Sequence, residues 1–217
     1  MRRILANRAH RSDRSASLRR PLLFLLLAAL AFLVSGCHFR PLVDTAPLDN
    51  VGMSYDAIEQ LKALDVTALE VAQVVAARRG GFPDASCVES VRIFHGRGQA
   101  FEAGDAVAGL LGAGMQVETI LELARLDQLG LGAGELQAMK LAALPDTIIL
   151  EVARHHAGGK LVLAGASLAT LKNAGLREST LLELARRGVP DSQADAVLSF
   201  RRHGASDDQI LRRFAGS

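Results

Sequence analysis

Five side chains of this 217-residue chain combine reactive atoms with an informative position: Cys37, Cys87, Glu151, His155 and His156. Glu151 and His155 are four residues apart, so a helix would place their carboxylate and imidazole on one face, where they could hold a metal ion. A structural zinc site takes four ligands, and no third ligand stands at a matching spacing. We therefore interpret His155 and His156 as a helix end and expect no metal and no cofactor.

Cys37 stands at the end of a very apolar stretch. Residues 1–36 contain seven arginines and a single acid, Asp13, followed by the 14 apolar residues from Pro21 to Val34. A helix that spans a bilayer needs about 20 apolar residues, so this stretch is short for a permanent anchor. A basic segment, a short apolar stretch and small residues at its end are typical of a secretory signal.

The residues Val34-Ser35-Gly36-Cys37 resemble the lipobox of bacterial lipoproteins. The resemblance implies cleavage before Cys37 and attachment of palmitate and diacylglycerol to this residue, which would bind the protein to the membrane. His38 is not an aspartate, which implies the outer membrane, facing the periplasm. The alternative is an ordinary signal or a short anchor followed by a chance cysteine.

Removal of residues 1–36 would change the charge of the protein. The full chain has 25 basic and 23 acidic residues, whereas the part from Cys37 onward has 18 and 22, a net charge of −4. A mildly acidic domain argues against nucleic-acid binding, which depends on basic surface. Cys87 would be the remaining free thiol, and we expect a buried, small apolar residue there, with an intermolecular disulfide as the alternative.

An internal repeat organises the rest of the chain. Similar segments occupy residues 119–125, 148–154 and 180–186, and a small residue stands five positions before each. These small residues are Gly114, Ala143 and Gly175, with spacings of 29 and 32. A fourth copy begins at Gly204, and a weaker one, with Asp65 in the small-residue place, opens the domain. Gly130 and Gly188 mark intermediate breaks, so each repeat comprises two short helices joined by a tight turn.

The sequence therefore predicts an all-α fold, an array of short helical hairpin repeats of about 29–32 residues, either solenoid-like or a compact bundle. We expect nine to eleven helices between Tyr55 and Phe214. The predicted organisation is a signal peptide (1–36), a tether (37–54) and a helical repeat domain (55–217). Pro41 and Pro47 disfavour a helix in the tether.

Charged residues mark the predicted helix ends. Arginine pairs stand at 78–79, 186–187 and 201–202, and we interpret them as solvated helix-end charges that complement the helix dipole. A phosphate or lipopolysaccharide site is the alternative. Glu122 and Arg125, and likewise Glu183 and Arg186, are three apart and are expected to pair on an exposed face.

The turn Leu111-Gly112-Ala113-Gly114, with Val117 and Ile120 after it, resembles the helix-hairpin-helix motif, and residues 130–134 are a looser echo. The resemblance implies backbone N–H groups that bind a DNA phosphate, as in a membrane-tethered DNA receptor. The geometry of helical repeats accounts for the same glycines without DNA.

No motif of a catalytic nucleophile, a cysteine metal site or a phosphate-binding loop occurs in the sequence. We therefore expect no catalytic residues and predict a non-catalytic scaffold or protein-interaction module, with another envelope protein or a peptide as its partner. A DNA-binding receptor and an enzyme with an unrecognised site are the alternatives.

Overall fold

The computed structural model describes residues 43–129, 133–159 and 163–214, all within the second of the two units into which the chain divides. These residues form twelve α-helices and one short 3₁₀ helix, with no strand among them, which confirms the predicted all-α fold. The helices are α2 (Ala46–Asn50), α3 (Tyr55–Ala63), α4 (Ala68–Arg79), α5 (Asp84–Gly96), α6 (Gly104–Gly112), α7 (Val117–Arg125), α8 (Ala133–Leu141), α9 (Asp146–Ala157), α10 (Gly165–Asn173), α11 (Glu178–Arg186), η1 (Asp191–Gln193), α12 (Ala194–Arg202) and α13 (Asp207–Phe214).

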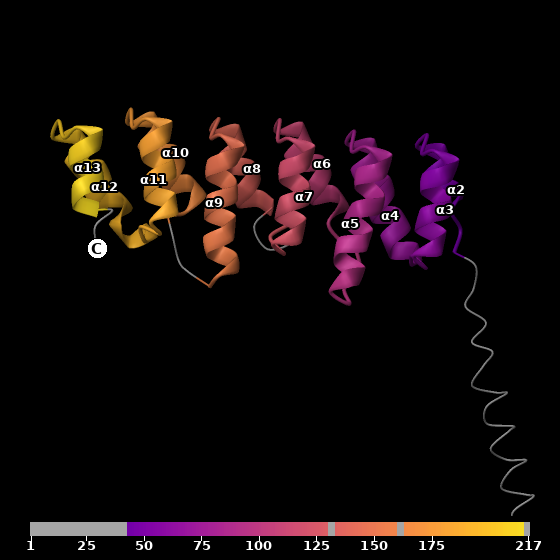
Figure 1. Ribbon diagram of the computed structural model, residues 1–217. Coiled ribbons are helices and arrows are strands. Elements are labelled where there is room, and N and C mark those ends of the chain that lie inside the picture. Colours follow the sequence, from indigo (N-terminus) through magenta and orange to yellow (C-terminus); the bar gives the residue numbers. More distant parts are fainter. Residues whose placement is uncertain (1–42, 130–132, 160–162, 215–217) are drawn as a thin grey trace, which may run out of the picture. The chain divides into compact units, whose positions relative to one another are not determined.

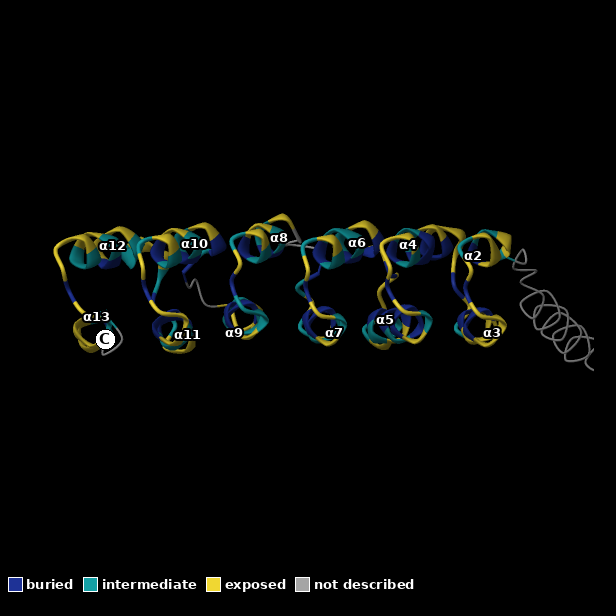
Figure 2. Cartoon of the chain, turned by 90° about the horizontal axis from the view of Figure 1, so that it is seen from above, coloured by how far each residue is buried: buried dark blue, intermediate teal, exposed yellow. Residues whose placement is uncertain are grey.

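The α-helices form six consecutive hairpins that stack in two rows (Figures 1 and 2). The even row contains α2, α4, α6, α8, α10 and α12, and the odd row contains α3, α5, α7, α9, α11 and α13. Each helix packs mainly on the helices two before and two after it, so each hairpin contacts its neighbours in the array. The first and last hairpins lie at opposite ends of the rows (Figure 1), which is the arrangement of a solenoid.

The helical domain begins before Tyr55. Helix α2 lies inside the predicted tether, and its Leu48 is completely buried in the core. The tether prediction of 37–54 is therefore wrong in its second half. Pro47 does not prevent the helix, because it lies in the first turn, where a backbone N–H has no helical partner to lose. Cys37 and the predicted signal peptide lie outside the described residues.

Every helix from α2 to α12 ends in the same way. A residue with left-handed backbone stands two positions after the last helical residue, at Gly52, Asp65, Gly81, Gly98, Gly114, Asp127, Ala143, Gly159, Gly175, Gly188 and Gly204. In nine of these helices the next residue then closes the helix, as where the N–H of Met115 donates to the carbonyl of Leu110 at 3.0 Å. The repeated small residues of the sequence are thus helix C-caps, although Gly130 itself lies outside the described residues.

We predict that Ala143→Gly stabilises the protein. Ala143 has φ of 57°, a conformation that costs a residue with a Cβ about 1 kcal/mol and glycine almost nothing. The free energy of unfolding in urea should rise by about 1 kcal/mol. The control Ala138→Gly, at an exposed position within α8, should lower it by a similar amount. Destabilisation by both changes would contradict the assignment of the Ala143 turn.

The hairpins alternate, so the full structural period is two hairpins. The second helices α3, α7 and α11 have 9 residues each, whereas α5 and α9 have 13 and 12. Aspartate begins the second helix of every even-numbered hairpin, at Asp84, Asp146 and Asp207, with spacings of 62 and 61 residues. The left-handed residues that follow the first helices of consecutive hairpins are 29 to 33 residues apart, which is about half of the structural period.

These three aspartates join neighbouring hairpins. One oxygen of each accepts the N–H of the residue before the preceding odd-row helix: Ser54 for Asp84 (2.8 Å), Gln116 for Asp146 (3.0 Å) and Arg177 for Asp207 (3.1 Å). The other oxygen pairs with a cation six residues earlier: Arg78, Lys140 and Arg201, respectively. Each carboxylate thus satisfies a helix N-terminus of one hairpin and a cation of its own hairpin.

The arginine pairs are therefore not uniformly solvated. Arg78 and Arg201 form ion pairs at 2.6 Å and 3.0 Å, and the prediction of free helix-end charges is wrong for both. They differ from their neighbours because the aspartate at the start of the next helix lies within reach. Arg79, Arg186 and Arg202 are exposed, as predicted.

Between the second and third hairpins, and between the fourth and fifth, the hydrogen-bond acceptor is a side chain on an even-row helix. Gln73 Oε1 accepts the N–H of Gly104 at 2.8 Å, and Glu135 Oε1 accepts the N–H of Gly165 at 2.7 Å. Gly104 and Gly165 each begin an even-row helix. A Cβ on Gly104 would lie 1.9 Å from the carbonyl oxygen of Gln73, so the close approach at this junction requires glycine.

The aspartate contacts predict loss of stability in acid. Burial raises the pKa of Asp146, but hydrogen bonds from Lys140, Gln116 and Thr119 outweigh burial and hold the pKa below its usual value. The folded state therefore favours the ionised form. Its contribution is present above the unfolded pKa, near 4, and is lost as the pH falls through the lower folded-state pKa.

Asp146→Ala should accordingly lower the free energy of unfolding by about 2 kcal/mol at pH 7, with a smaller difference from wild type at acidic pH. The control Asp208→Ala, at an exposed first-turn position of α13, should change it by less than about 0.5 kcal/mol. Urea denaturation at several pH values measures both. Equal effects of the two changes would contradict the role of Asp146.

Candidate functional site

Glu151 and His155, the two residues that the sequence suggested as metal ligands, each have another partner in the structure. Glu151 pairs with Arg154 at 3.3 Å, and His155 Nε2 lies 2.9 Å from the carbonyl oxygen of Arg186 on the neighbouring α11. His156 lines a hollow between α8 and α9. In the described part of the chain, no three His, Cys, Asp or Glu residues are grouped as metal ligands.

A buried carboxylate–imidazole pair was not anticipated from the sequence. Glu70, 1% exposed, lies 2.7 Å from His95 Nε2, and the same oxygen accepts the N–H of Phe101 at 2.9 Å. Its other oxygen accepts the backbone N–H and the hydroxyl of Thr67. Burial raises the pKa of Glu70, and these hydrogen bonds outweigh burial and lower it. These contacts hold α4, α5 and the chain before α6 together, so we assign Glu70 a structural role in the packing of these segments.

The spacing Thr67-x-x-Glu70 is the signature of a capping box, and it could have revealed part of this arrangement. His95 and Phe101 are 25 and 31 residues from Glu70 in sequence, and only the packing of α5 and of the chain before α6 on α4 brings them to it.

Cys87 is completely buried in α5, which confirms its interpretation as a small apolar core residue. Burial, with a smaller contribution from the nearby Asp84, raises the pKa of its thiol to about 12. A thiol with this pKa carries almost no thiolate at neutral pH and is a poor nucleophile.

We predict that native Cys87 resists alkylation. In a Cys37→Ala variant, where Cys87 is the sole thiol, iodoacetamide at pH 8 should leave the folded protein unmodified over a period that fully alkylates it in urea. Intact mass measures the modification. Alkylation of the folded protein at the rate of the urea-unfolded chain would show that the thiol is accessible.

The turn that resembles a helix-hairpin-helix motif has its backbone donors occupied. The amides of Ala113, Gly114 and Met115 donate to carbonyls at the end of α6. The amide of Gln116 donates to the Asp146 carboxylate of the next hairpin. A DNA phosphate at this turn would have to displace that carboxylate, so these amides do not favour the DNA hypothesis.

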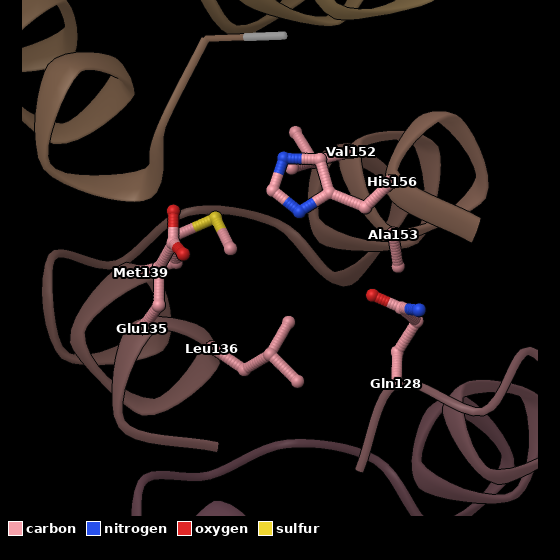
Figure 3. Close-up of a pocket in the computed structure, with 7 residues that line it drawn as sticks. All are labelled: Gln128, Glu135, Leu136, Met139, Val152, Ala153 and His156. Atoms are coloured by element: carbon pink, nitrogen blue, oxygen red, sulfur yellow. The ribbon is translucent and has the colours of Figure 1, made fainter. Parts of the chain in front are cut away.

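A water-sized hollow lies between α8 and α9 (Figure 3). Its volume is about 20 Å³, enough for one small polar group rather than a metabolite. Gln128, which follows α7, points into it from one side, and His156 of α9 lies above (Figure 3). The remaining lining residues are Glu135, Leu136 and Met139 of α8 and Val152 and Ala153 of α9.

The exposed residues of the two rows differ in kind. The odd row carries twelve exposed charged side chains: Asp56, Glu59, Lys62, Arg92, Glu118, Arg125, Arg154, Glu178, Arg186, Asp208, Arg212 and Arg213. Several form ion pairs with acidic residues of the same helix or of a neighbouring odd-row helix. Arg125 of α7 pairs with Glu122 of α7 at 3.4 Å and with Glu89 of α5 at 3.3 Å. Glu183 pairs with Arg187 at 2.6 Å, and the structure shows no pairing with Arg186.

The even row exposes five charged residues along the helices seen in Figure 2: Asp49, Arg79, Asp105, Asp195 and Arg202. Most of its other exposed residues are small or uncharged: Ala68, Leu69, Ala72, Gly112, Gly134, Ala138, Leu141, Ala166, Thr170, Asn173, Ala196 and Ser199. Leu69 and Leu141 are 52% and 70% exposed. A hollow of about 150 Å³ lies between α10 and α12, with Leu171 and Leu198 among its lining residues. The even row is therefore the less polar surface of the array.

Searches against protein-family models, curated proteins and solved structures found no match to this chain. Among the helices that the structure describes, none is both long and apolar enough to span a bilayer.

Proposed function

We propose that the protein is a lipid-anchored, non-catalytic interaction module of the bacterial outer membrane, facing the periplasm, and that its partner is another envelope protein or a peptide. The observation that carries this proposal is the contrast between its two rows: the odd row exposes twelve charged side chains, several of them paired, whereas the even row exposes five and shows mainly alanine, glycine and isolated leucines.

A surface of this kind suits protein association. Small side chains have little conformational entropy to lose on binding, and they permit close approach of a partner. The core of a protein interface is depleted in charge, as the even row is. Stacked repeats extend such a surface over several hairpins.

The position of Cys37 supports an anchored module. Cys37 stands nine positions before the start of α2 at Ala46, and an extended chain over nine positions spans at most about 30 Å. An acylated Cys37 would thus hold the first hairpin near the bilayer. Two or more acyl chains, at about 0.8 kcal/mol per buried CH₂, provide stable attachment.

Metabolic labelling with a palmitate analogue tests the anchor. We expect label on the wild-type protein and none on Cys37→Ala, with an intact mass that corresponds to a chain beginning at the acylated Cys37. An unlabelled protein that retains residues 1–36 would overturn the proposed localisation and restore a basic N-terminal segment.

Site-specific photocrosslinking in cells tests the interaction surface separately. A photoreactive residue at Ala138, exposed on the even row, should crosslink to envelope proteins. The matched control at Ala157, exposed on α9 of the odd row, should give little crosslinking. The reverse pattern would contradict the assignment of the even row as the binding surface.

A further inference from the structure

We infer that the hollow between α8 and α9 is a binding site for a compact primary ammonium group, such as that of a lysine side chain or a small polyamine. This inference is independent of the proposed membrane anchor, because it rests on side chains of α8, α9 and the turn before them.

The two-hairpin period provides an internal comparison. Residues 62 positions before Gln128, Glu135 and His156 are Val66, Gln73 and Phe94. Val66 and Phe94 are 3% and 8% exposed, and Phe94 packs edge-on against Phe101. Thus the same place in the earlier copy contains an apolar core with one amide. The later copy has three polar side chains around a hollow, which folding alone does not require.

Glu135 carries a charge that the junction does not need. Gln73 performs the same structural task with a neutral amide, accepting the N–H of Gly104 as Glu135 accepts that of Gly165. Within the described residues, no lysine or arginine pairs with Glu135, although its side chain is only partly exposed. The N–H of Gly165 satisfies one oxygen of this partly buried carboxylate, and a bound cation would pair with the charge that remains.

The other lining residues favour a primary ammonium. A volume of about 20 Å³ matches a group the size of water. Gln128 provides an amide oxygen, and a neutral His156 provides a ring nitrogen, so both can accept hydrogen bonds from the three N–H donors of an ammonium. Leu136, Met139 and Val152 line the hollow as well, and each is at most 4% exposed, so the site admits the ammonium group alone and the methylene chain would extend outward.

The test uses the intact protein purified in detergent, with methyl-labelled methionine, and titration with cadaverine and with Nα-acetyl-lysine methylamide. The methyl resonance of Met139, which lines the hollow, should shift with saturation in the millimolar range, since the ligands are small. Glu135→Gln should weaken binding about tenfold or more, because it removes the charge and keeps the amide oxygen that Gln73 shows to be sufficient for folding.

Gln73→Glu, the reverse change at the equivalent position, is the control and should leave binding to the Met139 site unchanged. Absence of a saturable shift, or equal affinity of wild type and Glu135→Gln, would overturn the inference. Titration with Zn²⁺ distinguishes an ammonium site from a metal site. If Zn²⁺ binds tightly and shifts the Met139 resonance while neither amine binds, the hollow is a metal site and the inference is overturned.

Discussion

The fold depends on how each hairpin satisfies the helix ends of its neighbour. The helices are short, and the first backbone N–H groups of every helix lack a partner inside that helix. In this array the missing acceptor is often a side chain of the adjacent hairpin: Asp146 at the start of α7, Glu135 at the start of α10. Apolar burial brings the hairpins together, and these acceptors fix the register in which they stack.

The alternation of junctions has a local cause. Helices α5 and α9 begin after Pro83 and Pro145, which have no N–H to donate. An aspartate from the next hairpin would find no donor there, and those junctions instead use Gln73 and Glu135 on the even row. The prolines and the aspartates thus determine together which type of junction forms, and the pattern of junctions repeats every two hairpins.

Helices, C-caps and the repeat were predictable because they follow from local chemistry. Ala143 stands in the place of Gly114 and Gly175, so the repeat already marked a turn there, and φ of 57° shows that this turn is a left-handed cap. Contacts between hairpins were not predictable. The Ser54–Asp84 and Gln116–Asp146 contacts depend on residues that stacking brings together. The Arg78–Asp84 and Glu70–His95 pairs form within one hairpin, and they depend on how its two helices pack. The start at Ala46 was missed because Pro47 was judged without its position in the first turn.

The two-hairpin period also constrains how such a chain can change in length. Adding or deleting one hairpin would place two junctions of the same type next to each other. Either an aspartate would then face a proline, which has no N–H to donate, or a helix start would lack its side-chain acceptor. A unit of 61 or 62 residues restores both junctions. A change in length that keeps every junction complementary therefore adds or removes two hairpins at a time.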